Sequence, residues 1–222
     1  MNDARKHFSP GDRERIRQRI AELEKRTDAE VVCAVASESG RYDRAESVCG
    51  LVFGLIALIS GNKIVGMGGW NAAPDLSLGL QVTLTVAGFV IGSVLASYWH
   101  GLRHLFVFHS ETVSEVNRSA HHVFSQRGIG GTMRRGGMLI YLSLFERRLE
   151  IRCDRAVAEK LSQADLDAIH SAVLDKVRAG DPTGGVIAGL TRAEDSLAKA
   201  FPATGAAPDE LPNELLVFHP RP

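Results

Sequence analysis

The hydrophobic pattern divides the chain into two mixed regions separated by a long apolar stretch. Between residues 48 and 99 only Lys63 and Asp75 carry charge, whereas both flanks are dense in Arg, Asp and Glu. Residues 76–99 are long enough to cross a bilayer, which takes about 20 residues, and the first span must continue from residues 48–60 through Lys63. The pattern therefore predicts a transmembrane helical hairpin, with a buried hairpin in a soluble protein as the alternative.

Two crossings would return the chain to the side on which it began. Arg41 and Arg44 precede the first span, and Arg103 follows the second. Lys63 is the single basic residue between them. The positive-inside rule then places both termini in the cytoplasm and the protein in the inner (plasma) membrane of a bacterial-type cell, with membrane lipid as a partner.

Small residues within the second span suit close helix contact. Gly88 and Gly92 are one helical turn apart and form a small-xxx-small step. They can pack against the first span or against another copy of the chain, so both a monomer and a homo-oligomer are compatible with the sequence.

The flanks predict helices and strands in alternation. Ser9, Pro10 and Asp12 have the residue types of a helix start, and residues 30–35 have the apolar composition of a buried strand. Later elements are expected as helices over 111–126, 165–179 and 183–200, N-capped by Ser110, Ser162 and Thr183, and as antiparallel strands over 138–144 and 147–152.

One strand before the hairpin, two after it and helices on both sides predict a compact α/β/α sandwich with a mixed sheet, interrupted by a two-helix transmembrane hairpin. This fold requires both flanks to contribute to one sheet. Residues 1–47 and 100–202 would form the two parts of the α/β domain, residues 48–99 the hairpin, and residues 203–222 a flexible tail rich in Ala, Pro and acidic residues.

Charge and cysteine content exclude several classes of function. The 26 basic and 26 acidic residues balance, so nothing in the net charge indicates a nucleic-acid partner. The three cysteines, Cys33, Cys49 and Cys153, have no CxxC spacing, which argues against a disulfide framework and a zinc knuckle.

Several segments outside the hairpin resemble the TPM domain family, named for thylakoid, photosystem II repair and modulator proteins and also described as phosphatases. The similar segments are residues 24–32, the strand 137–143, the turn and strand 146–151, and the connection 181–189 between the last two helices. The resemblance covers about residues 8–47 and 110–202. It implies an α/β domain that acts either in the assembly or maintenance of membrane proteins or as a metal-dependent phosphatase.

Two departures from the family pattern weaken the metal-dependent alternative. Members with proposed Mg²⁺ or Ca²⁺ sites tend to carry Asn or Asp before the glycine that starts the second strand, whereas this chain has Arg134 and Arg135 there. The glycine-rich stretch that usually follows the strand pair is replaced by residues 152–155, Arg-Cys-Asp-Arg. Two arginines repel a cation, so the sequence favours an interaction module without catalytic metal.

The loop over residues 127–137 has the composition of an anion-binding site. Glycines expose backbone N–H groups, and arginines bind phosphate or lipid headgroups. The candidate residues are Arg127, Gly130, Gly131, Thr132, Arg134 and Arg135. The loop follows a helix and lacks the Gly-Lys-Ser/Thr ending of a P-loop, so a plain flexible turn is the alternative.

Four carboxylates and a histidine pair are the remaining candidates. Asp28, Glu30, Asp154 and Asp165 are expected near the ends of the central strands, where they could act in acid–base catalysis or hold Mg²⁺ or Ca²⁺. Asp165 is also explained as a helix-start residue and Asp28 as a turn residue. His100 and His104 have the i, i+4 spacing of metal ligands but would need a third ligand.

Overall fold

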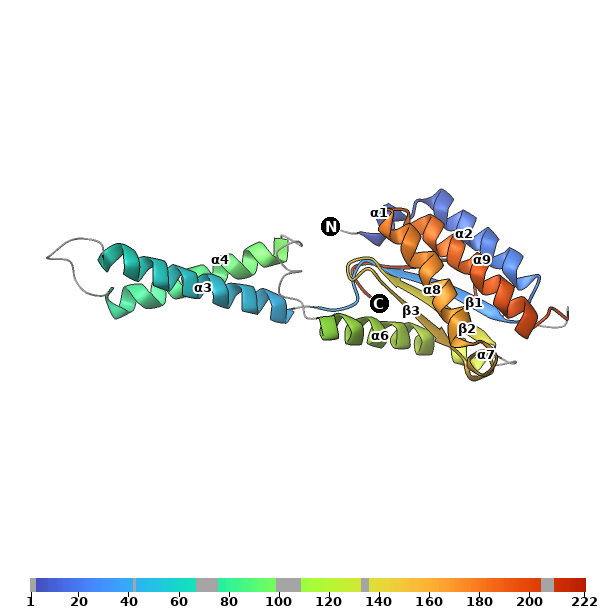
Figure 1. The fold of residues 1–222 in the computed structure, drawn as a ribbon. Coiled ribbons are helices and arrows are strands. Elements are labelled where there is room, and N and C mark those ends of the chain that lie inside the picture. Colours follow the sequence, from blue (N-terminus) through green and yellow to red (C-terminus); the bar gives the residue numbers. More distant parts are fainter. Residues whose placement is uncertain (1–2, 42, 67–75, 99–108, 133–135, 205–209) are drawn as a thin grey trace. The chain divides into compact units, whose positions relative to one another are not determined.

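The computed structural model describes residues 3–41, 43–66, 76–98, 109–132, 136–204 and 210–222, and the chain divides into two compact units (Figure 1). Residues 41–111 form a helical unit that contains α3 (Asp43–Gly66) and α4 (Leu78–Tyr98). Residues 2–40 and 112–222 form an α/β unit. Each unit is described by itself.

The α/β unit is built on a mixed four-stranded sheet in the order β3-β2-β1-β4. The central strand β1 (Glu30–Ala36) pairs in parallel with β2 (Gly137–Ser143) and β4 (Leu216–Phe218). β3 (Arg148–Cys153) pairs antiparallel with β2. The strand before the hairpin therefore lies beside a strand after it, which confirms that both flanks share one sheet.

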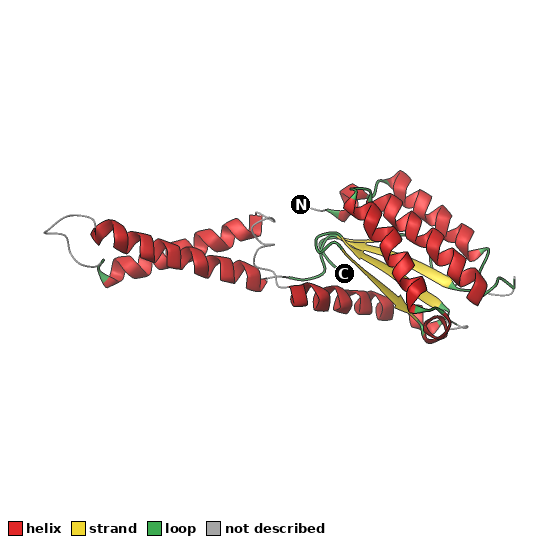
Figure 2. Cartoon of the chain, in the orientation of Figure 1, coloured by secondary structure: helices red, strands yellow, loops and turns green. Residues whose placement is uncertain are grey.

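Helices cover both faces of this sheet, as expected for an α/β/α sandwich (Figure 2). α2 (Pro10–Glu24), α8 (Gln163–Arg178) and α9 (Pro182–Ala200) pack on the face formed by Val31, Cys33 and Val35. α6 (His109–Gln126) packs on the opposite face. Short elements complete the unit: α1 (Ala4–His7), the 3₁₀ turn η1 (Ile129–Gly131) and α7 (Arg155–Lys160).

The alternation of side chains along β1 explains its continuous apolar sequence. Val32, Ala34 and Ala36 face α6, whereas the odd-numbered residues face the three-helix layer. All seven residues of β1 are buried. A strand buried on both faces has no wet face that polar residues could occupy.

A buried ion pair joins α2 to α9. Glu194 is 5% exposed and accepts hydrogen bonds from Arg19 and Arg26. Burial raises the pKa of Glu194, but the two guanidinium groups outweigh this effect and the net shift is downward. The carboxylate therefore stays charged and holds the two helices together.

The helix starts are partly as the sequence predicts. Ser9 and Ser162 cap α2 and α8 through complete capping boxes. The cap of the last helix was predicted wrongly, because the side chain of Asp181 accepts from the Gly184 N–H and Pro182 occupies the first helical position, so Thr183 lies inside α9. α6 begins at His109, which places Ser110 within its first turn rather than before it.

The end of the chain differs from the flexible tail expected over residues 203–222. Leu216–Phe218 form β4, which pairs with the last three residues of β1. The apolar run Leu215–Phe218 supplies this strand, and without it β1 would present an open edge. Residues 219–222 then continue past the end of β1, where the N–H of Glu38 donates to the Pro220 carbonyl at 3.0 Å.

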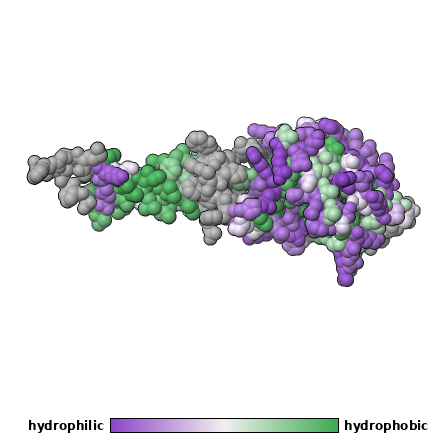
Figure 3. All heavy atoms as spheres, viewed as in Figure 1, coloured by the Kyte–Doolittle hydropathy of each residue, from purple (hydrophilic) through white to green (hydrophobic). Residues whose placement is uncertain are grey.

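α3 and α4 each have the length and apolar composition to cross a membrane, over residues 46–65 and 78–98. Their contacts show that they pack antiparallel, because Gly50 of α3 lies against Phe89 and Gly54 lies against Thr85. The surface of this pair is predominantly hydrophobic, in contrast to the mostly hydrophilic surface of the α/β unit in the same view (Figure 3).

The glycines of the hairpin are used in the contact between its own two helices. A Cβ added at Gly88 would lie 2.8 Å from the Phe53 carbonyl oxygen and 2.9 Å from the Gly54 Cα, and a Cβ at Gly92 would lie 2.7 Å from the Phe53 Cβ. Gly88 and Gly92 therefore pack against α3 of the same chain, and they are not available to a second copy while this contact holds.

We predict that Gly88→Ala destabilises the hairpin by about 1–3 kcal/mol, because the added methyl group meets backbone atoms that cannot move without separating the helices. Denaturation with sodium dodecyl sulfate, followed by circular dichroism, measures the effect. The matched control is Gly79→Ala, since nothing lies within 4 Å of the Cβ position at Gly79. Equal midpoints for the two variants would contradict the close packing at Gly88.

Candidate functional site

The sheet has two ends that carry different chemistry. We call the end where β1 and β2 begin, at Glu30 and Gly137, the amino end, and the end where β1, β2 and β4 finish, at Ala36, Ser143 and Phe218, the carboxyl end. The glycine loop, Asp28, Glu30 and Asp154 all lie at the amino end. Asp165 belongs to α8, which lies in the layer of helices on the sheet face opposite α6.

Glu30 and Asp154 flank Gly137 on the face that α6 covers. Glu30 is paired with Gly137, and the Asp154 N–H donates to the Gly137 carbonyl at 2.8 Å. Glu30 and Asp154 are therefore two interstrand spacings apart, which is about 10 Å between their Cα atoms. The Ile129 backbone lies directly over Gly137, where any side chain would collide with it. The two carboxylates are therefore not adjacent, and η1 occupies the space between them.

Asp28 and Glu30 hold the segment that leads to β4. Asp28 accepts from the N–H and the hydroxyl of Thr204, at 3.0 and 2.8 Å. Glu30, which is 7% exposed, accepts from the N–H groups of Glu210 and Leu211 at 3.4 and 3.3 Å. Both side chains thus satisfy backbone donors from residues far along the chain.

Asp165 completes the capping box of α8 and also accepts from the Ser196 hydroxyl at 2.9 Å, which ties α8 to α9. The hydrogen bond from Ser162 is the largest cause that lowers its pKa, and the carboxylate is charged at neutral pH. The structure therefore gives Asp165 a complete role in helix termination and packing.

Asp154 retains one free acceptor. Its Oδ1 caps α7 by accepting from the Arg155 N–H at 2.6 Å, and it lies 3.9 Å from the Cβ position of Gly130. Its Oδ2 is buried and has no hydrogen-bond partner among the residues that the structure describes. Among the candidate carboxylates, Asp154 is the one with a buried oxygen that lacks a partner in the described part of the chain.

The glycine loop uses part of its hydrogen-bonding capacity internally. Thr132 is 5% exposed and accepts from the Gly136 N–H at 3.2 Å, and the Gly131 N–H donates to the Gly128 carbonyl at 2.8 Å. Arg127, Gly130 and Gly131 are exposed. Arg134 and Arg135 lie outside the residues that the structure describes, so the anion site remains a prediction.

Metal ligands do not converge within the described part of the chain, where no group of three or more His, Cys, Asp or Glu side chains could hold an ion. His100 and His104 lie outside the described residues, as does Arg103. Burial raises the pKa of the Cys153 thiol to about 11, so it stays protonated at neutral pH.

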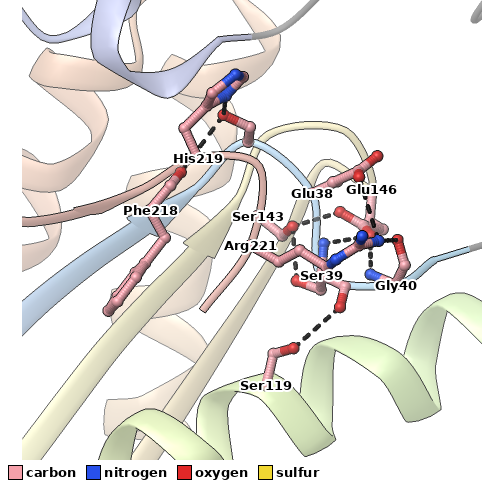
Figure 4. A network of polar contacts seen from close by, with 10 residues as sticks. Glu38, Ser39, Gly40, Ser119, Ser143, Glu146, Phe218, His219 and Arg221 are labelled. Atoms are coloured by element: carbon pink, nitrogen blue, oxygen red, sulfur yellow. Dashed lines mark hydrogen bonds and ion pairs between the residues drawn. The ribbon is translucent and has the colours of Figure 1, made fainter.

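A polar network at the carboxyl end was not anticipated from the sequence (Figure 4). The Ser39 hydroxyl lies 2.9 Å from the Tyr141 hydroxyl and donates to Ser143 at 2.8 Å, and Ser143 donates to the Glu146 carboxylate. Since Ser39 donates to Ser143, its oxygen accepts from Tyr141. Burial raises the pKa of Tyr141 to about 12, so the phenol remains a donor.

This network fixes the residues that lead to the hairpin. Glu146 accepts from the N–H groups of Ser39 and Gly40 at 2.8 and 3.3 Å. The Ser119 hydroxyl of α6 donates to the Ser39 carbonyl at 3.0 Å, and Arg221 donates to the Gly40 carbonyl at 3.3 Å. The β2–β3 turn, α6 and the segment after β4 therefore all bind the end of β1.

Ser37, His219 and Asp3 meet at the same end but do not form a catalytic triad. The His219 Nδ1 lies 2.7 Å from the Ser37 hydroxyl and 3.3 Å from Asp3 Oδ1. A triad needs the hydroxyl and the carboxylate on different ring nitrogens. Ser37 also accepts from the Ala4 N–H at 2.9 Å, so this group joins the start of the chain to its end.

Comparison with known proteins agrees with the fold. The NMR structure of the BA42 protein from the psychrophilic bacterium Bizionia argentinensis is similar, with a TM-score of 0.58 at 16% sequence identity over 95% of each chain. The TPM domain family matches residues 101–196. The chain therefore contains a TPM domain. Its TPM domain is completed by β1, which precedes the matched residues. No curated protein matches the sequence.

We predict that Glu146→Ala lowers the free energy of unfolding of the TPM domain by about 2–3 kcal/mol, because buried donors on Ser39, Gly40 and Ser143 lose their acceptor. Urea denaturation of the detergent-solubilised chain measures this loss. The control is Glu159→Ala, which removes an exposed pair with Arg155 and is expected to change stability by less than about 0.5 kcal/mol. Similar values for both variants would show that the network contributes little.

Proposed function

We propose that the protein is a membrane-anchored TPM domain that acts as an interaction module in the assembly or maintenance of membrane proteins. The observation that carries this proposal is how the candidate carboxylates are used. Asp28, Glu30 and Asp165 each accept hydrogen bonds that hold the fold together, and η1 separates Glu30 from Asp154. A domain whose acidic residues are engaged in this way is suited to presenting surfaces to partners.

Membrane anchoring is supported by the outward face of the hairpin. Large apolar side chains are exposed along both helices, including Leu55, Ile59, Val86 and Val90, which are 47–56% exposed. A contiguous apolar surface of this length is unusual on a monomeric soluble protein. Lipid acyl chains would remove it from water.

Polar side chains within the hairpin are satisfied by its own backbone. Thr83, Thr85 and Ser93 donate to the carbonyls of Gly79, Gln81 and Glu46 at 2.8, 2.8 and 3.3 Å. The Gln81 amide donates to the Leu76 carbonyl at 2.8 Å. In a bilayer no water can take over such bonds, so internal satisfaction of this kind supports insertion.

We predict that the hairpin crosses the bacterial inner membrane with both termini in the cytoplasm. The protein should resist extraction with alkaline carbonate. Alkaline phosphatase inserted after Gly66 should be active in the periplasm, whereas the same reporter fused after Pro222 should be inactive. Extraction of the intact chain by carbonate would contradict anchoring, and the reverse reporter pattern would contradict the orientation alone.

A second candidate function is phosphate-ester hydrolysis at the amino end, which the partnerless Oδ2 of Asp154 favours. A buried carboxylate oxygen beside an exposed glycine loop could bind a divalent ion or position a water molecule. Arg127 would supply positive charge for the phosphate. Mg²⁺ and Ca²⁺ are the ions to test, because both prefer oxygen ligands.

We expect the wild-type protein to show no metal-dependent phosphatase activity with p-nitrophenyl phosphate in the presence of Mg²⁺ or Ca²⁺. Activity that falls at least tenfold in Asp154→Asn would establish the hydrolase and contradict the interaction module. Asp165→Asn is the matched control, since its carboxylate also caps a helix but lies in the other layer. Equal loss in both variants would point to instability rather than catalysis.

A further inference from the structure

Three segments of the TPM domain meet at Ser37, at the carboxyl end of the sheet. Its hydroxyl accepts from the Ala4 N–H of α1, its N–H donates to the Phe218 carbonyl of β4, and its carbonyl accepts from the Phe145 N–H of the β2–β3 turn at 3.0 Å. We call the charged residues of these segments and of the end of β1 the rim. They are Asp3, Arg5, Lys6, Glu38, Glu146, Arg147 and Arg221.

The acids of the rim face inward. Asp3 is 7% exposed and pairs with Arg5 and His219. The hydrogen bond from Arg5 is the main cause that lowers its pKa. Glu38 pairs with Arg221 at 3.4 Å, and Glu146 accepts from the backbone at the end of β1. The negative charges of the rim are thus engaged by the protein itself.

Three of the four cations of the rim face solvent. Arg5, Lys6 and Arg147 are exposed, and Arg147 makes no ion pair with the residues that the structure describes. Arg147 also has a φ of 50°, a left-handed conformation that Gly or Asn adopts with less strain. A strained, exposed arginine at the tip of a tight turn suggests that its side chain has a function there.

The chain connects this rim to the hairpin. Gly40 lies at the carboxyl end, and α3 begins three residues later at Asp43, so the peptide chain keeps Gly40 within about 11 Å of the start of α3. The exposed Arg127 of the glycine loop lies beyond the other end of β1, at least six residue steps or about 20 Å away along the strand.

We propose that the rim binds the anionic phospholipid headgroups of the bilayer that the hairpin crosses, with Arg147, Arg5 and Lys6 as the contacting side chains. The proposal rests on the membrane anchoring argued above. Positive charge beside a bilayer is attracted to its anionic lipids, and each Lys or Arg near the surface strengthens binding about fivefold at moderate ionic strength. The contact would hold the TPM domain in one orientation against the membrane.

The test is hydrogen–deuterium exchange on the full chain in nanodiscs of phosphatidylcholine, with or without phosphatidylglycerol. Amides of residues 3–8 and 144–148 are expected to exchange several-fold more slowly when phosphatidylglycerol is present, and high salt should remove the difference. Arg147→Asn should reduce the protection about fivefold, because Asn keeps the backbone conformation without the charge. Arg127→Asn removes an exposed arginine at the other end of the sheet and should leave the protection unchanged.

The outcomes separate this proposal from membrane anchoring. Stable insertion without any effect of phosphatidylglycerol on the rim would overturn headgroup binding and leave anchoring intact. Loss of protection in Arg127→Asn rather than Arg147→Asn would also overturn it, and would assign the headgroups to the glycine loop. If the chain floats with vesicles only when phosphatidylglycerol is present and is released by salt, headgroup binding stands and the membrane span fails. If it floats with neither vesicle, both fail.

Discussion

Parallel pairing between β1 and β2 is the constraint on which the rest of the structure depends. Parallel strands run in the same direction, so the chain that leaves the carboxyl end of β1 must return to the amino end before β2 can begin. α6 makes this return, packed on the face that contains Val32 and Tyr141. The hairpin is inserted between β1 and α6, inside the connection of a βαβ unit.

This position explains how the apolar hairpin can interrupt a domain without dividing its core. The insertion begins after Gly40, beyond the carboxyl end of the sheet, so it interrupts no pairing between strands. Long insertions in a surface connection add little loop-closure entropy, since that cost grows only slowly with length. Seven paired residues between β1 and β2 then hold the two flanks together. The network around Ser39 and Glu146 stabilises the point at which the chain leaves.

Local signals in the sequence were sufficient for most elements. Ser9 and Ser162 are followed by acidic residues at the third helical position, and the charge-free stretch before Tyr98 gives the second hairpin helix. β4 could not be predicted in this way, because three apolar residues in a tail rich in Pro and Ala show no periodicity. The Asp181–Pro182 pair was a readable signal for the start of α9, but Thr183 offers the same capping chemistry two residues later.

The candidate site was harder to predict, because the partners of its residues are distant in sequence. The bonds of Asp28 to Thr204 and of Glu30 to Glu210 span 176 and 180 residues, and no pattern in the sequence indicates them. From the sequence, the carboxylates could be predicted to lie near the ends of strands, but not at which end of the sheet. Asp28 precedes β1 and Glu30 is its first residue, whereas sites in α/β sheets usually follow the carboxyl ends of the strands.

At the carboxyl end, Ser37 and Ser39 follow β1 and Ser143 ends β2. The hydroxyls of these serines bond to one another and to the chain. A hydroxyl network that is satisfied internally has little capacity left for a substrate. It does fix the backbone on both sides of the β2–β3 turn. The end of the sheet where chemistry is usually expected is therefore used here to position the exit of the hairpin. The proposed headgroup contact would use the charges around that exit.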